Sequence, residues 1–540
     1  MTRLSNIFLK GIVALALAVC LFPLVAVAIA AMAVPGDTIL GLIDTVLPRY
    51  AINTVGLVLV TCGLAVIIGL ATAWLVTMAE FPGRRLLEVS LVLPFAFPAY
   101  VMAYAYTHVL DHPGIVQSTL RDVFGWGPRD YWFPEIRSFG GAALMLALVL
   151  YPYVYLLARA VFLSQSSAQF IAARTLGHGP WSTFFRISLP MSRAAVFGGV
   201  LLVAMETIAD FGTVSFFGVQ TFATGIYQSW FSMADRSAAA QLALCLLSFA
   251  ILLALLERFT RRSSVTTHGR RKDIMPRFQL HGPKAWLATV ACGLPVLLGA
   301  ILPTWALLTM AIGSEQNLLS ARYQGFIHNS LTLAVIASAL TVTVAMSLGS
   351  ARRIFPGSFT RTAFQAGRLG YAVPGGVIAV GLMVPVAAFD NWLDDVMELY
   401  FGISTGLLIT GSITLLLAAY MIRFLAAAIN AYESGASAVN PNLDDAARVL
   451  GASPLRTAMR IHSPLLTPSL LTAALIVFVD VMKELPATLI LRPFNFDTLA
   501  VQAFRLASDE RLNGAAVPSL VIAAIGLVPT ILLCRQISRD

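Results

Sequence analysis

The stretch AARTLGHGPWSTFFRISLP, residues 172–190, recurs as AARVLGASPLRTAMRIHSP, residues 446–464. Aligned without a gap, so that position 172 matches position 446, the two copies are identical at ten of their 19 positions. Both begin with two alanines, share a glycine at their sixth position and end in a proline. This order predicts a short helix, a turn at the glycine and a second helix along the membrane face, with the proline at the start of the next span. The duplication predicts that the chain consists of two parallel, similar halves.

The composition places the chain in a bilayer. Of its 540 residues 58% are hydrophobic and only 12% are charged, and the mean hydropathy is +0.81. A soluble globular chain carries about a quarter charged residues. The five cysteines lie in or at the ends of apolar segments without paired spacing, which argues against a disulfide framework and against a zinc site.

Twelve apolar runs are long enough to cross a hydrocarbon core, which takes about 20 helical residues. They lack the alternation of barrel strands, and backbone polar groups cannot be left bare in lipid, so the spans are expected to be helices. The fold class is therefore an all-α polytopic membrane protein with about 12 transmembrane helices in two parallel six-helix repeats. The runs are residues 11–32, 52–78, 87–110, 139–162, 194–209, 237–256, 286–312, 331–348, 369–389, 403–429, 465–482 and 515–533.

The distribution of basic residues predicts the orientation. With both termini in the cytoplasm, 24 of the 36 Lys and Arg residues fall inside, nine fall outside, and three lie in or at the ends of helices. Cytoplasmic loops carry this excess, so both repeated stretches are expected in the cytoplasm. The first run also fits a signal peptide, because Arg3 and Lys10 precede it and small residues follow near Ala30. Its length favours an uncleaved helix.

A basic linker, residues 258–285, separates a first repeat, residues 1–257, from a second, residues 286–540. The linker holds eight basic residues and one acid, Asp273. A nucleic-acid patch is one explanation of this charge. A cytoplasmic connector that touches anionic lipid headgroups explains it better, because the linker joins two membrane segments. We therefore expect membrane lipid, and no nucleic acid, as its partner.

Four acids lie at equivalent positions in the helices that follow the repeated stretches: Glu206, Asp210, Asp480 and Glu484. Acids in a membrane span are costly and tend to face a cavity or a partner. Glu206 lies about 24 Å along a helix from Pro190, at 1.5 Å per residue, and hence near the outer mouth. These acids are candidates for the translocation path, where oxygen ligands suit a hard cation. The alternative is structural: they cap helix ends or pair with Lys483, Arg492 or Arg505.

A further acidic group is expected to form a solvated outer loop: Asp390, Asp394, Asp395 and Glu398. The seven histidines show no metal-ligand spacing, and no metal site is assigned. The chain also lacks the Gly-x-x-x-x-Gly-Lys-Ser/Thr phosphate loop. We therefore expect that the chain does not hydrolyse ATP, is not itself an enzyme and binds no cofactor.

The repeated stretch resembles the EAA motif of ABC importer permeases, in which two alanines, a glycine and an Ile-x-Leu-Pro ending form the coupling helix. The usual glutamate position holds Ile171 in the first copy and Asp445 in the second, and a leucine is replaced by Ser463, so the two copies are not equivalent. The resemblance assigns the following residues to ATPase docking: Ala172, Ala173, Gly177, Ile187, Pro190, Asp445, Ala446, Ala447, Gly451, Ile461 and Pro464.

Two further stretches, METIADFGTV at residues 205–214 and KELPAT at residues 483–488, resemble the fused permeases of ferric iron ABC importers. The resemblance implies a type I importer fold in a bacterial inner membrane. It also implies a periplasmic ferric-binding protein and two copies of a cytoplasmic ATPase, which use ATP and Mg. Thiamine, polyamine and sulfate permeases share the docking motif and remain alternatives. A twelve-helix secondary transporter also has parallel halves, but it would carry coupling acids near mid-membrane and no duplicated docking loop.

Overall fold

The computed structural model of the chain describes residues 2–33, 36–165, 171, 173, 175–177, 179–262, 277–317, 319–437, 439–440 and 442–539. These residues are almost entirely helical; the two strands among them, β1 (Ala79–Glu80) and β2 (Phe278–Gln279), pair in parallel. Within this part of the chain, eleven helices are long and apolar enough to span a membrane, or twelve if one bent pair counts as a single span. The predicted all-α multi-pass fold is confirmed.

The described chain divides into two compact units. Unit 1 comprises residues 1–48, 222–250 and 317–502, and unit 2 comprises residues 49–221, 251–316 and 503–540. Each unit thus combines the central helices of one half of the sequence with segments from the other half. The predicted repeat boundaries at residues 257 and 286 concern the duplication of the sequence, and they stay a prediction.

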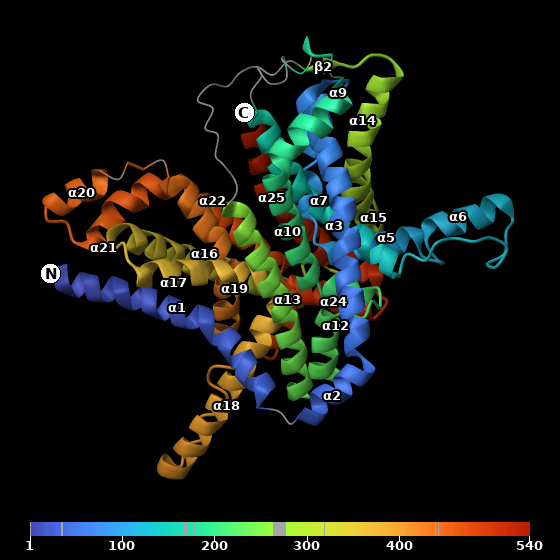
Figure 1. The fold of residues 1–540 in the computed structure, drawn as a ribbon. Coiled ribbons are helices and arrows are strands. Elements are labelled where there is room, and N and C mark those ends of the chain that lie inside the picture. The colour runs from blue at the N-terminus through green and yellow to red at the C-terminus, as the bar shows by residue number, and fades with distance from the viewer. Residues whose placement is uncertain are drawn as a thin grey trace. The chain divides into compact units, whose positions relative to one another are not determined.

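Unit 1 is built on three long helices that pack against one another: α16 (Ala321–Ile354), α19 (Ile413–Ala436) and α22 (Ser463–Lys483). The first helix of the chain, α1 (Thr2–Met32), packs against this group and against α18 (Gly375–Phe401) (Figure 1). The remaining helices lying wholly in this unit are α2 (Gly36–Thr45), α12 (Phe222–Tyr227), η3 (Gln228–Ser232), α17 (Ser358–Leu369), η5 (Gly370–Ala372), α20 (Asn442–Val449), α21 (Pro454–Thr457), η6 (Ala458–His462) and α23 (Pro486–Leu491).

Unit 2 has two contacting groups of helices. In one, α7 (Phe139–Ser164) packs along α10 (Leu189–Ala209); in the other, α15 (Leu302–Ile312) and α25 (Leu512–Arg539) pack on each other and on α5 (Ala99–Leu110). Its other helices are α4 (Arg84–Ser90), η1 (Leu93–Ala96), α6 (Ile115–Phe124), α9 (Pro180–Thr183), η2 (Phe184–Ser188), α11 (Gly212–Phe216), α14 (Pro283–Val296) and η4 (Leu297–Ile301). Three helices cross the unit boundaries: α3 (Leu47–Met78), α13 (Arg236–Arg262) and α24 (Leu499–Ser508).

The third predicted span, residues 87–110, is not one straight helix. It is divided between a segment ending at Ala96 and a segment beginning at Ala99, bent by 97°. Pro98 stands between them in an extended conformation, with ψ at 143°. Proline cannot donate a backbone hydrogen bond and disfavours helix at the residue before it, so the span breaks here. Pro374 precedes α18 in the same conformation, with ψ at 141°.

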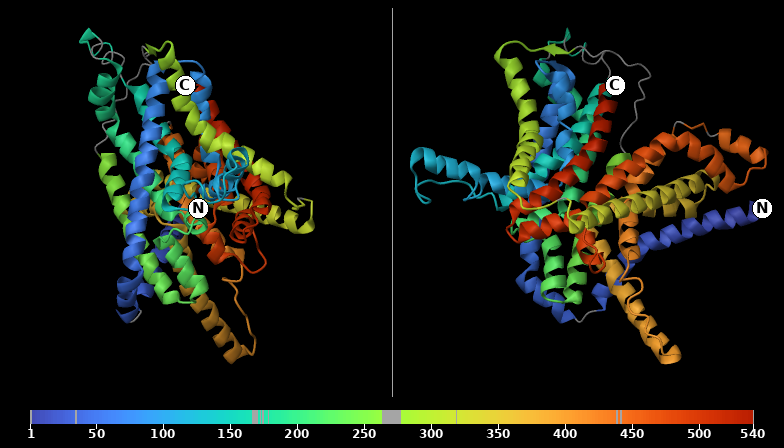
Figure 2. Two further views of the ribbon diagram at one scale, coloured as in Figure 1. Left: turned by 90° about the vertical axis from the view of Figure 1, so that its right-hand side faces the viewer. Right: turned by 180° about the vertical axis from the view of Figure 1, so that it is seen from behind.

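The expected acidic outer loop is wrong, because these acids belong to α18. Asp390 is buried and accepts hydrogen bonds from the backbone of Ile409 and Thr410, while Asp394 accepts from Thr405 and Gly406. The two carboxylates thus hold the chain that follows α18 in a non-helical path. For this reason α19 begins at Ile413 and not at position 403, where the predicted run starts. The last turns of α18 extend away from the other helices of unit 1 (Figure 2).

Candidate docking segments and substrate path

The two docking segments are residues 171–190 and 442–464, which contain the repeated stretches. The first contains a glycine turn and a helix that continues into the predicted span. Ala172 lies outside the described residues. Gly177 has φ at +80°, in the left-handed region that glycine adopts without strain. Beyond it, α9 continues through the π-helical turn η2 into α10, so Ile187 and Pro190 lie on one helical segment, Trp181–Ala209. The predicted second helix is therefore the beginning of the span itself, because η2 joins the two without a break.

The second docking segment has the same construction. Its first helix, α20, ends in a glycine cap: the N–H of Ala452 donates to the carbonyl of Ala447 at 2.9 Å, and the N–H of Gly451 donates to Arg448 at 3.1 Å. Gly451 has φ at +74°. These two hydrogen bonds, together with a residue in the left-handed conformation, satisfy the last carbonyl groups of the helix. After the turn, α21 and η6 lead into α22, and this span carries Ile461 and Pro464.

Apolar side chains stand exposed around both turns. The side chains exposed by more than half are Ile171, Leu176, Trp181 and Phe185 in the first segment, and Val449, Leu450 and Met459 in the second. The second alanine of each pair, Ala173 or Ala447, is buried instead. Asp445 is exposed and lies 3.2 Å from Arg448 on its own helix. Grouped exposed apolar residues mark protein interaction sites.

Asp210, a candidate path residue, caps a short helix. Its carboxylate accepts hydrogen bonds from the backbone of Thr213 at 3.1 Å and of Val214 at 3.2 Å, and from the Thr213 hydroxyl at 3.0 Å. These groups begin α11, so Asp210 satisfies helix N–H groups that lack an intrahelical partner. Glu206 lies one turn earlier on α10 and is half-buried.

Glu484 has the equivalent role in unit 1. Its carboxylate accepts from the backbone N–H groups of Ala487 at 2.9 Å and Thr488 at 3.0 Å, at the start of α23. The guanidinium of Arg423 lies 3.6 Å away, on α19. Asp480, one turn earlier on α22, is half-buried. The helix-capping alternative therefore describes what Asp210 and Glu484 do locally, and each unit holds one capping acid and one acid on the preceding turn.

Sequence reasoning missed Arg423 as the partner of Glu484. The candidate partners that the sequence indicates for the four acids, Lys483, Arg492 and Arg505, lie closer to Glu484 along the chain. Arg492 instead pairs with Asp497. The available signal was an arginine inside an otherwise apolar run, which indicates a buried partner without identifying it.

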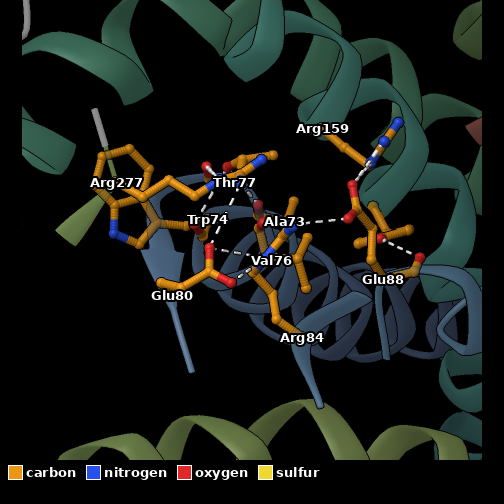
Figure 3. A network of polar contacts seen from close by, with 10 residues as sticks. Ala73, Trp74, Val76, Thr77, Glu80, Arg84, Glu88, Arg159 and Arg277 are labelled. Atoms are coloured by element: carbon orange, nitrogen blue, oxygen red, sulfur yellow. Dashed lines mark hydrogen bonds and ion pairs between the residues drawn. The ribbon is translucent and has the colours of Figure 1, made fainter. Parts of the chain in front are cut away.

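A buried ionic network in unit 2 was also missed. Glu88 on α4 accepts hydrogen bonds from Arg84 at 2.9 Å, and from Nε and Nη2 of Arg159 on α7 at 2.9 and 2.7 Å (Figure 3). Arg84 also pairs with Glu80 on β1, which in turn pairs with Arg277 beside β2. The network ties the start of α4 to α7. It ties the end of the linker to β1 through Glu80, and to α3 through the carbonyl of Thr77, which accepts from Nε of Arg277.

Unit 1 has a network at the equivalent place with the charges exchanged. If the spacing of 274 residues between the two repeated stretches is continued toward the N-terminus, Arg159 corresponds to Glu433. Glu433 pairs with Arg352 at 2.7 Å and with Arg368 at 3.1 Å. In each unit one charged residue of the helix before the docking segment is thus neutralised by basic or acidic partners on neighbouring elements. The signal that could have revealed these pairs is that Arg159 and Glu433, at corresponding positions of the two halves, carry opposite charges inside apolar runs.

Comparison with known proteins now identifies the family. The family described as binding-protein-dependent transport system inner membrane component matches the chain twice, at residues 65–264 and 357–537. The Fe(3+)-transport system permease protein FbpB 2 of Haemophilus influenzae is 24% identical over 88% of this chain and 87% of its own length. The ferric transport system permease protein FbpB of Actinobacillus pleuropneumoniae is 25% identical over 82% of this chain and 64% of its own.

The molybdenum transport system permease protein ModB of Escherichia coli strain K12 is 29% identical, over 37% of this chain and 88% of its own length. No solved structure matches the chain. The two matches of the family cover more than half of the 540 residues, and they include both docking segments. This chain belongs to the family of binding-protein-dependent transport system inner membrane components.

Proposed function

We propose that this chain is the membrane permease subunit of an ATP-driven importer and that its cargo is ferric iron delivered by a periplasmic binding protein. The observation that carries the proposal is the pair of docking segments of one construction, each with a left-handed glycine and exposed apolar side chains at the end of a span. Family membership is consistent with this reading and does not fit a secondary transporter.

The partners follow from this reading. Two copies of a cytoplasmic ATPase would dock at the two segments, and both termini would lie in the cytoplasm of a bacterial cell, with the chain in its inner membrane. When the ATPase pair binds ATP and closes, it would push on both docking segments. Because each segment continues through a π-helical turn into α10 or α22, a push at the turn reaches the acids at the far ends of these helices.

Ferric iron as cargo is supported by two relatives that match most of the chain, because both are named as permease proteins of ferric iron transport systems. Glu206, Asp210, Asp480 and Glu484 are proposed to line the path. Oxygen ligands suit a hard cation, and the half-buried Asp210 and the buried Glu484 lie at the breaks that end α10 and α22. A second candidate cargo is an oxyanion, since the molybdenum and sulfate permeases match shorter parts of the chain at 29% and 33% identity.

The test uses the complex of the full chain with its ATPase in vesicles, and compares binding protein loaded with Fe(III), molybdate or sulfate. We expect Fe(III) alone to stimulate ATP hydrolysis and to enter the vesicles. Replacing Gly177 and Gly451 by leucine should abolish transport while leaving basal ATP hydrolysis, because a side chain in the left-handed region costs about 1–2 kcal/mol at each turn. Gly179→Leu is the matched control, since this exposed glycine has open space and no left-handed φ. Unchanged transport in the double variant would contradict the docking role.

A further inference from the structure

A buried histidine joins the second docking helix to the membrane helices of unit 1. His462, the last residue of η6, has 1% of its surface exposed. Its Nε2 lies 2.6 Å from Oδ1 of Asp444 on α20, and its Nδ1 lies 3.0 Å from the hydroxyl of Ser350 on α16. A neutral imidazole donates at one nitrogen and accepts at the other, so one ring can serve both contacts.

Asp444 receives a second charged partner. Nε of Arg353, on α16, donates to Oδ2 of Asp444 at 2.7 Å, and the same guanidinium donates to the carbonyls of Ala436 and Val439 at the end of α19. Burial alone would raise the pKa of Asp444, but the hydrogen bonds from His462 and Arg353 outweigh it and lower this pKa below its ordinary value. The ionised carboxylate can only accept, so Nε2 of His462 is the donor.

The first docking segment is held differently. In the alignment of the two copies His462 corresponds to Ser188, whose hydroxyl forms no hydrogen bond within the described part of the chain. The neighbouring contacts are aromatic: Phe184 of η2 packs on Trp74 of α3 with ring centroids 5.0 Å apart, and Trp74 packs edge-on against Phe162 of α7 at 5.6 Å. Apolar contacts of this kind are weakly directional, whereas hydrogen bonds to an ionised group require defined geometry.

We propose that His462 is a positioning residue, which fixes the second docking helix α20 to α16 and α22 so that force applied by the ATPase at α20 reaches the membrane helices. This inference rests on the proposed function. It predicts that the two docking segments transmit force by different means. One substitution can weaken the attachment of the second segment, because His462 is one of only two side chains described here that hold Asp444, the other being Arg353. The aromatic contacts of the first segment are spread over several rings.

The experiment uses the full chain with its ATPase in vesicles, supplied with Fe(III)-loaded binding protein and containing a trapped fluorescent iron chelator. Iron entry and ATP hydrolysis are measured together for His462→Ala, His462→Gln and the matched control Ser188→Ala. We expect His462→Ala to lower the iron transported per ATP about tenfold, the effect of losing one hydrogen bond to a charged group. His462→Gln should recover part of this loss, because its amide nitrogen can donate to Asp444. Ser188→Ala should equal the wild type.

A spin label at Val449→Cys, in a variant without the native cysteines, measures the motion of α20 directly, because this side chain is 87% exposed. The label should become more mobile in His462→Ala and not in Ser188→Ala. A wild-type ratio of iron to ATP in His462→Ala, or equal ratios for the alanine and glutamine variants, would overturn the inference. If His462→Ala does not fold, Asp444→Asn replaces it under the same criteria. If the wild-type complex moves no iron, the proposed function fails, while the spin label still decides the role of His462.

Discussion

Replacing Glu88 by glutamine tests the buried network of Figure 3. Glu88 accepts three charge-assisted hydrogen bonds, one from Arg84 and two from Arg159, and the two guanidinium side chains are only 5% and 8% exposed. Each such bond contributes about 1.5–3 kcal/mol. Glutamine keeps one acceptor oxygen and costs less to bury than a carboxylate, so the full sum is not lost. Removing one partner of a buried ion pair typically costs about 3–5 kcal/mol. We expect Glu88→Gln to lower the free energy of unfolding by an amount in this range.

The assay is the thermal midpoint of the detergent-solubilised chain, followed as the fraction that still elutes folded from a size-exclusion column. A loss of this size should lower the midpoint by about 5 °C. Arg85→Gln is the matched control, because Arg85 is the exposed neighbour of Arg84 and an exposed substitution changes stability by about 0.5 kcal/mol or less. Adding Arg159→Met to Glu88→Gln should recover part of the loss, since it removes the surplus buried charge. A Glu88→Gln midpoint equal to that of the control would refute the reasoning.

Two other substitutions give expected outcomes in the same assay. Gly370→Ala should lower the midpoint strongly, because its Cβ would lie 1.9 Å from the carbonyl oxygen of Ile422, whereas Gly63→Ala, with open space around it, should not; equal midpoints would contradict the packing. Glu510 concerns pH. The hydrogen bond from Arg137 lowers the pKa of Glu510 below 4.5, so its stabilisation is present above that pH and is lost as the pH falls through the folded-state value. Below about pH 4.5 the wild-type midpoint should therefore fall more steeply than that of Glu510→Gln, and parallel curves would count against this ion pair.

The sequence determined those features that follow from local chemistry. Apolar runs of helical length predicted the spans, and the break before Ala99 follows from Pro98, whose ring excludes a continuous hydrogen-bond ladder. The glycine turns were predictable because Gly177 and Gly451 occur at one place in both copies, and both have φ in the region that other residues avoid. Duplication strengthened each of these predictions, because one local pattern appeared twice.

The tertiary structure alone decided which distant groups meet. Arg423 lies on α19 while its partner Glu484 follows α22, and Ser350 on α16 meets His462 on η6. A charged or polar residue in an apolar run signals that burial requires a partner, because desolvation is costly, but periodicity along one helix says nothing of which helix lies beside it. Tertiary packing likewise decides which segments of the chain make up each unit. Packing places α1 against α16 and α18, far along the chain, and no local preference of α1 specifies those neighbours.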